Sequence, residues 1–432
     1  MKRTTLLALA LPAALALPGG AAAQLTMQTD NGWAFTFSGN VNAFAVYNHG
    51  AEPDVGEDGP IFGGLTSIER ATRIRTGLLP GFAVLNAKGR EGNFDLGVQI
   101  GFAPQINSNS LHDNFGAQID MRQVFLTVGG TWGQVLAGRE LGLYQRQNIL
   151  TDMTLFGVGV SGGQVGAGGT TLGRIGTGYL YPNFNAQMTY STPAGRPLQL
   201  AVGLFDPSVV VGDNGDFSDA FTGTQLPRLE AELSLSSAFG STQGDNLAGA
   251  AAARNKATVW VNGLLQNTNF FEVEPTDGSE NPSLTSVGLG GGVKVDAGGL
   301  GLVGSGYYAK GLGTTLMFGQ ALGAILPAVP GEDPAGRTSL GYLAQVTFTP
   351  ARGKLTLGAS YGASLLQSDE DLDGPDDGND LVENNSSAIG LVSYQMTKSL
   401  RYVTEVTHSS SESFSGNSRS ANQLAAGLML FF

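Results

Sequence analysis

Apolar and polar residues alternate with a period of two along many stretches of the chain. In residues 354–365, leucine, alanine and tyrosine fall on one face, and lysine, threonine, glycine and serine fall on the other. Such strict alternation indicates a β-strand with one apolar face. The end of the chain, residues 423–432, alternates in the same way and closes on two phenylalanines. The pattern therefore predicts an all-β protein.

The alternation predicts sixteen strands. Even-numbered strands are mostly followed by short turns and odd-numbered strands by long loops, with residues 240–255 as one exception. Short periplasmic turns, long external loops and apolar faces about ten residues long are typical of outer-membrane barrels. We therefore expect a transmembrane antiparallel β-barrel in which the last strand pairs with the first. The expected strands lie near 33–47, 72–88, 93–104, 120–129, 133–140, 176–192, 197–205, 227–239, 256–270, 284–296, 299–311, 338–350, 353–366, 385–398, 400–409 and 421–432.

The N-terminus has the pattern of a secretory signal peptide. Lys2 and Arg3 form a basic start, an apolar run follows, and three alanines end at Ala23. We expect cleavage there, which divides the chain into a signal peptide, 1–23, and a single barrel domain, 24–432. No apolar run of roughly 20 residues, the length of a membrane-spanning helix, remains after that cut.

Composition narrows the function. The chain has no cysteine, so a disulfide and a thiolate metal site are excluded. Without Lys2 and Arg3 the formal charge changes from −13 to −15, and nucleic-acid binding proteins instead carry basic faces. We expect no nucleic-acid partner. The balance of 36 acidic residues against 21 basic ones in the mature chain predicts a weak preference for cations.

One stretch resembles a known family. Residues 121–159 contain Gly138 and Arg139 before a long loop, and Thr151, Asp152 and Met153 within it. Over nearly all of the mature length, the chain is similar to the Gram-negative general porins, which are sixteen-stranded trimeric diffusion porins. The resemblance implies a homotrimer and a third external loop, about 141–175, folded into the lumen. Enteric porins have a second acid after the Thr-Asp-Met element, and here "TLFGVG" has none, so we expect a more apolar narrow point.

Charged residues near that loop are the candidates for the pore constriction. Carboxylates on the loop that face guanidinium groups on the wall would set up a transverse field. For each residue the alternative is a solvated lumen position or a structural pair within the loop. The facing of Arg122 is ambiguous, because Val124 and Leu126 share its face of the strand. The loop candidates are Asp152 and Glu140; the wall candidates are Arg122, Arg174, which the resemblance places on the basic wall, Arg73, Arg75 and Arg139.

A predicted external loop, about 367–384, is strongly acidic. Its aspartates and Gly374 follow the spacing of short calcium loops, in which six to eight oxygens surround Ca²⁺. The simpler interpretation is a solvated acidic loop that repels anions or meets lipopolysaccharide through divalent ions. No cofactor is required by the sequence. The candidate Ca²⁺ ligands are Asp369, Asp371, Asp373, Asp377 and Asp380.

The sequence therefore predicts a porin of the Gram-negative outer membrane, a water-filled channel for passive diffusion of small hydrophilic solutes and ions. The alternative is a channel selective for a sugar or a small anion, with a binding site among the aromatic residues near the constriction, Tyr144, Phe156, Tyr179 and Tyr181. An enzyme is not expected, because none of the three histidines, His49, His112 and His408, lies in a recognisable serine motif. Expected partners are two further copies, outer-membrane lipid, lipopolysaccharide and the solutes.

Overall fold

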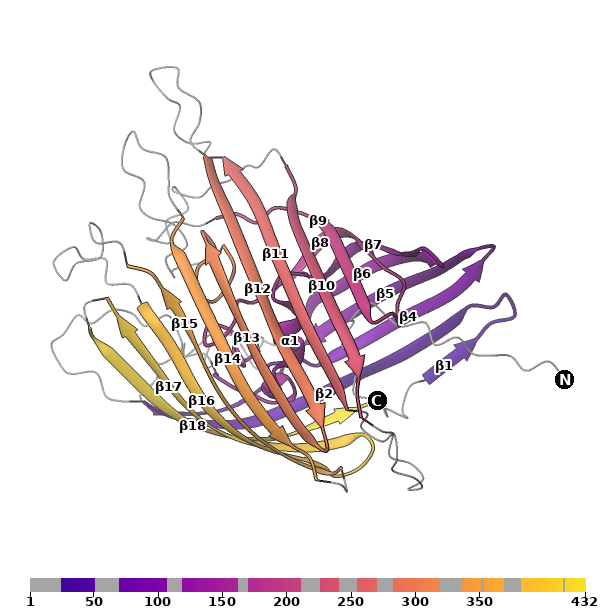
Figure 1. Cartoon of the computed structure of the whole chain (residues 1–432). Helices are drawn as coiled ribbons and strands as arrows, with labels where there is room; N and C mark the ends of the chain where they lie inside the picture. Colours follow the sequence, from indigo (N-terminus) through magenta and orange to yellow (C-terminus); the bar gives the residue numbers. More distant parts are fainter. Residues whose placement is uncertain are drawn as a thin grey trace, which may run out of the picture.

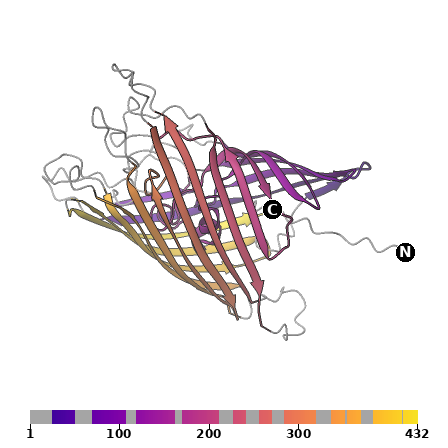
Figure 2. The same cartoon turned by 45° about the horizontal axis from the view of Figure 1, so that its top comes forward.

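The computed structural model describes residues 25–50, 70–106, 119–161, 170–210, 226–240, 255–269, 283–318, 336–350, 353–368, 382–414 and 416–432. The predicted signal peptide lies outside these residues. The strands form one antiparallel sheet that closes on itself, as Figures 1 and 2 show. They are β1 (Leu25–Gln28), β2 (Ala34–Gly50), β3 (Arg70–Arg75), β4 (Phe82–Glu91), β5 (Phe94–Pro104), β6 (Ile119–Gly130), β7 (Gly133–Leu141), β8 (Phe184–Ser191), β9 (Leu198–Phe205), β10 (Arg228–Ala238), β11 (Lys256–Asn269), β12 (Ser283–Ala297), β13 (Leu300–Lys310), β14 (Thr338–Phe348), β15 (Leu355–Leu366), β16 (Val382–Gln395), β17 (Leu400–Ser413) and β18 (Ser418–Phe431).

The closed wall has sixteen strands, as the sequence predicts. β3 and β4 both pair with β2, one with each half of it, and together they make a single interrupted barrel strand. β1 pairs with the start of β2. The remaining strands, from β5 to β18, follow one another in order around the barrel.

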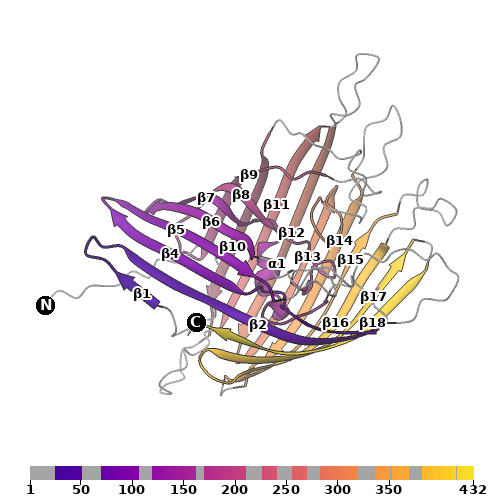
Figure 3. The same cartoon turned by 180° about the vertical axis from the view of Figure 1, so that it is seen from behind.

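The two ends of the chain meet at the seam of the barrel. β18 pairs with β2 as far as Phe431, and Phe432 exchanges two backbone hydrogen bonds with Gly39, with N···O distances of 2.7 and 3.0 Å. β1 then continues along the same edge of β2, where Leu25 pairs with Phe37 (Figures 1 and 3). The terminal strand has both neighbours, β17 and β2, so its apolar residues belong to a closed wall.

The two faces of the wall differ as the alternation predicts. Outward side chains are exposed and apolar, as on the lipid face of a membrane barrel. They include Val41, Tyr47, Leu126, Met188, Leu200, Leu233, Val261, Leu302, Val346, Leu357, Tyr402 and Leu428. Inward side chains are largely polar and buried, and include Asn42, Gln99, Gln123, Gln187, Glu230, Asn262, Gln345, Ser360, Glu405 and Gln423.

Two of the strand predictions need correction, and one short strand is additional. The strand predicted at 72–88 is interrupted at 76–81, where the amide of Leu78 donates to the carbonyl of Gly157 at 2.9 Å. The strand predicted at 176–192 begins only at Phe184, so the third long connection runs over 142–183 instead of 141–175. β1 was not predicted, because four residues are too few to show a period.

The connection 142–183 contains the described helices. They are α1 (Arg146–Thr151) and a 3₁₀ turn, η1 (Met153–Phe156). In Figure 1, α1 lies within the outline of the barrel. Within the described ranges, neither is long and apolar enough to cross a membrane.

Candidate functional site

The first part of segment 142–183 is bound to β10. The backbone amides of Leu143 and Tyr144 donate to Oε2 of Glu230 at 2.7 and 2.9 Å. Arg146 then forms an ion pair with Glu232, at 2.7 Å between Nη2 and Oε1. Each buried carboxylate is therefore used to hold the start of the segment against the neighbouring wall.

The segment continues along the inward faces of more distant strands. The indole of Trp260 on β11 donates to the side chain of Asn148 at 2.9 Å. The amide of Met153 donates to Gln345 on β14 at 2.7 Å. The amide of Gly159 donates to Glu405 on β17, also at 2.7 Å. These contacts join a connection between β7 and β8 to strands far from both in the barrel order.

The segment then returns toward β8. Arg75 on β3 donates to the carbonyl of Thr170 at 3.2 Å. Arg174 donates to the carbonyl of Ser387 on β16 at 2.6 Å. The amide of Tyr181 donates to the carbonyl of Thr315 at 3.0 Å. The segment therefore makes hydrogen bonds to the inward side of the wall both before and after its midpoint.

The anchoring residues were not predicted as site residues. Glu230, Gln345 and Glu405 each occupy the polar face of an alternating strand, beside an exposed apolar neighbour. The sequence contains one signal that could have identified them: large acids and amides on the inward face need partners, because burying them alone is costly. The partner segment itself has no period that would reveal its path.

Asp152 and Arg174 do not face each other from loop and wall. Both belong to segment 142–183, and both are buried, with 4% and 0% of their surface exposed. The carboxylate of Asp152 accepts from the hydroxyl of Tyr179 at 2.6 Å and from the amide of Thr154 at 2.8 Å. Burial raises the pKa of Asp152, and burial lowers the pKa of Arg174 to about 10 although Asp152 opposes that change. The placement of Arg174 on a basic wall is therefore corrected: it is a buried residue of the segment itself.

Glu140 and Arg139, the two candidates near the end of β7, do not line either of the cavities described below. Glu140 is buried and accepts from the amide of Leu141 and from Gln123, both at 2.8 Å. Arg139 is exposed and pairs across the ladder with Val124, which lies on the outward face.

Arg73 and Arg75 share the inward face of β3. Arg75 is only 4% exposed, and its Nη2 is the atom that holds Thr170. Nε of Arg75 and Nη1 of Arg73 are buried and have no hydrogen-bond partner among the described residues. Neither guanidinium forms an ion pair with a described residue, so both place positive charge beside the returning part of the segment.

A β-bulge decides the facing of Arg122. Gly101 on β5 pairs with Gln123, but the next residue, Phe102, pairs with Met121, so Arg122 is the extra residue of β6. A bulge re-aims the side chains around it. Arg122 consequently lies on the inward side with Gln123, and not outward with Val124. Its Nε forms an ion pair with Asp120 at 2.8 Å, and its guanidinium carbon lies 5.6 Å from the ring centroid of Phe184.

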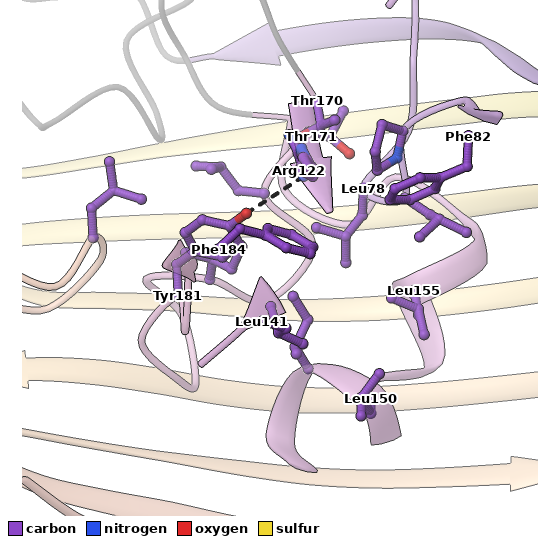
Figure 4. Close-up of a pocket in the computed structure, with 16 residues that line it drawn as sticks. Leu78, Phe82, Arg122, Leu141, Leu150, Leu155, Thr170, Thr171, Tyr181 and Phe184 are labelled. Atoms are coloured by element: carbon purple, nitrogen blue, oxygen red, sulfur yellow. Dashed lines mark hydrogen bonds between the residues drawn. The ribbon is translucent and has the colours of Figure 1, made fainter. Parts of the chain in front are cut away.

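Arg122 lines a cavity of about 140 Å³ on one side of the segment, which we call the slot. Figure 4 shows that Arg122 and Tyr181 approach each other at one end of it, with Leu150 and Leu155 of the segment farther along. The guanidinium donates to the Tyr181 hydroxyl at 3.4 Å. The rest of the lining is mainly apolar and includes Leu78, Phe82, Leu141, Leu155, Ile175 and Phe184.

A larger cavity of about 310 Å³, which we call the basin, lies on another side of the segment. Its charged lining residues are Lys294, Lys354, Arg401, Asp152 and Asp296. Leu150 and Leu155 line both the slot and the basin. The two cavities therefore adjoin across α1 and η1.

No group of acidic or histidine side chains in the described ranges is arranged to hold a metal ion. The predicted Ca²⁺ ligands, Asp369, Asp371, Asp373, Asp377 and Asp380, lie outside those ranges. Of the histidines, His49 and His408 are described and both are exposed. His408 contacts Asn422, with 2.9 Å between Nδ1 and Oδ1.

Several solved structures have the same fold. The outer-membrane channel DcaP of Acinetobacter baumannii is 17% identical, and 94% of this chain matches 99% of that one with a TM-score of 0.63. An anion-selective porin from Comamonas acidovorans is 11% identical, with 93% and 100% of the two chains matched and a TM-score of 0.56. The trimer form of OmpT from Vibrio cholerae is 14% identical, with 93% and 100% matched and a TM-score of 0.50.

The family comparison is more specific than these folds. No curated protein sequence matches the chain significantly. The family model described as Gram-negative porin matches residues 7–413, which is nearly the whole chain. Together with the closed sixteen-stranded wall, this confirms the resemblance seen in the sequence. The chain belongs to the Gram-negative porin family and is an outer-membrane channel protein.

Proposed function

We propose that the barrel is a water-filled channel for small hydrophilic solutes and ions, and that segment 142–183 is the inward-folded third external loop that narrows it. The observation that carries this proposal is the attachment of the segment to inward side chains of distant strands, above all to Glu405 on β17. A loop held there occupies the space that sixteen strands would otherwise leave open to water. The adjoining slot and basin support a path along the segment.

For ion selectivity we propose a weak preference for anions. The acidic net charge favours cations, as expected from the sequence, but charges act mainly within about 8 Å at physiological salt. Around the two cavities the described bases are Arg122, Lys294, Lys354 and Arg401, against the acids Asp152 and Asp296. The local excess of positive charge therefore opposes the acidic net charge of the chain, and the net effect is small.

We further propose a homotrimer without catalytic activity. The family resemblance implies three copies, and one similar structure is of a trimer form. We propose that the acidic loop at 367–384 is solvated and binds lipopolysaccharide through bridging divalent ions. The alternative is a specific Ca²⁺ site within the loop. A channel function requires no catalytic group.

The test is reconstitution of the mature protein in a planar bilayer. In a salt gradient we expect stepwise, ohmic conductance and a small reversal potential of the sign for anion preference. Absence of conductance from correctly folded protein would contradict the channel. A reversal potential of the opposite sign would show that the acidic loops control selectivity, and only that part of the proposal would be lost.

A further inference from the structure

The slot is unusual for a passage for hydrophilic solutes, because nearly all of its surface is apolar. Among the sixteen residues that line it, Arg122 is the single one with a charge. The polar uncharged residues are Thr170, Thr171 and Tyr181. A sugar, whose hydroxyl groups all need partners, would find few of them here. The slot therefore matches a solute with one charged end and an apolar body.

Arg122 has binding capacity left for such a solute. A guanidinium group has five N–H donors and stays charged at any ordinary pH. Nε is used by Asp120, and one donor of Nη1 reaches Tyr181. In the described part of the chain, no further hydrogen bond of this guanidinium is found, and Asp120 does not line the slot. The Nη donors can therefore bind a carboxylate with the paired geometry that arginine favours.

The size of the slot limits the apolar body. Its volume of about 140 Å³ is close to that of an engineered protein cavity of about 150 Å³ that binds benzene. Phe184, which lies against the guanidinium, and Leu155 of the segment line the slot. A ring or a branched chain of about six carbons would therefore fill it next to Arg122.

We propose that the slot binds small monocarboxylates with an aromatic or branched apolar body, the carboxylate on Arg122 and the body between Phe184 and Leu155. This inference rests on the proposed channel and names a class of solute for it. Such a solute replaces water in the apolar slot, so it is held there longer than a small inorganic anion. The channel then discriminates among anions by their body as well as by their charge.

The experiment measures block of single-channel conductance by benzoate, with acetate and benzamide as partner probes. Acetate has the charge without the ring, and benzamide has the ring without the charge. We expect saturable block by benzoate and at least tenfold weaker block by each of the others. Isothermal titration of the detergent-solubilised protein with benzoate provides a second measurement that does not depend on conductance.

Two variants with equal loss of charge complete the design. Arg122→Gln is expected to weaken block and binding of benzoate at least tenfold. Arg196→Gln removes an exposed guanidinium from the turn between β8 and β9 and is expected to leave both unchanged. Equal block by benzoate and acetate, or benzoate binding that survives Arg122→Gln, would overturn the inference. The proposed channel function would still stand in that case, because conductance itself would be observed. If the folded protein bound benzoate but gave no conductance, the result would contradict the proposed channel function and support benzoate binding in the slot.

Discussion

Glu405 on β17 accepts a hydrogen bond from the backbone amide of Gly159 at 2.7 Å, which joins segment 142–183 to the side of the barrel away from β7 and β8. The same carboxylate also accepts from the amide of Val158. Glu230 does the equivalent for Leu143 and Tyr144 at the start of the segment. Two buried carboxylates thus hold the loop by its backbone.

We predict that Glu405→Gln loosens the middle of the segment and leaves the barrel closed. An amide side chain offers one acceptor atom without charge, and hydrogen bonds to a charged group contribute about 1.5–3 kcal/mol. Hydrogen exchange at Val158 and Gly159 should therefore accelerate roughly tenfold to a hundredfold. Glu412→Gln, on an exposed residue of the same strand, is the control. Equal exchange in both variants would mean that Glu405 does not hold the segment.

Asp152 gives a prediction about pH. Burial raises the pKa of its carboxyl, so the folded protein binds this proton more tightly than the unfolded chain. The contribution of Asp152 to stability is then fully present below the ordinary aspartate pKa of about 3.9 and is lost as the pH rises through the raised value. Asp152→Asn has no such proton and keeps an acceptor for Tyr179. Thermal unfolding should show the wild type losing stability relative to this variant as the pH increases; a constant difference would contradict the raised pKa.

Arg401 is predicted to affect both selectivity and stability. Its guanidinium carbon lies 4.8 Å from the ring centroid of Phe156 in η1 and 5.7 Å from that of Phe431 in β18. Arg401→Gln should shift the reversal potential toward cations, whereas Arg401→Lys should not. Both lose the stacked guanidinium, which contributes about 0.5–2 kcal/mol. The exposed turn residue Arg196 supplies the control, because Arg196→Gln removes the same charge outside the basin. If the control shifted the reversal potential by the same amount, Arg401 would not lie on the path of the ions.

The seam between β18 and β2 depends on a close approach at Gly427. A Cβ atom there would lie 2.3 Å from the carbonyl oxygen of Ala43 and 2.4 Å from the ring of Phe44. Gly427→Ala is therefore expected to reduce the yield of folded, heat-resistant barrel. Gly304→Ala is the matched control, because the atom nearest to a Cβ there, on Val293, would be 4.0 Å away. If both variants fold equally well, then β18 and β2 can move apart at the seam far enough to accept a Cβ atom at position 427.

The strands of the wall could be predicted from the sequence because apolar and polar side chains alternate regularly along them. Lipid outside and polar groups inside impose a period of two, so β18 and β15 can be recognised from their side chains alone. Where the period fails, so does the prediction. At the interruption, 76–81, two adjacent leucines and the pair Pro80-Gly81 break the alternation, and the backbone is bound by the segment, as at Leu78.

The site could be predicted only in part. The resemblance located the loop and Asp152, but a loop without a period does not reveal which side chains are buried within it. Arg174 was therefore placed on the wall although it belongs to the segment. Arg122 shows a different difficulty: one extra residue in β6 reverses its facing, and a bulge leaves no reliable trace in the pattern.

The most direct test of the central claim uses the absence of cysteine from the chain. Leu150→Cys introduces a single thiol between the slot and the basin, and Leu428→Cys introduces one on the outward face of β18. A bulky water-soluble thiol reagent is added to single channels in a planar bilayer. The account predicts a stepwise fall in conductance for Leu150→Cys and none for Leu428→Cys. Unchanged conductance after complete modification of Leu150→Cys would contradict a path along segment 142–183.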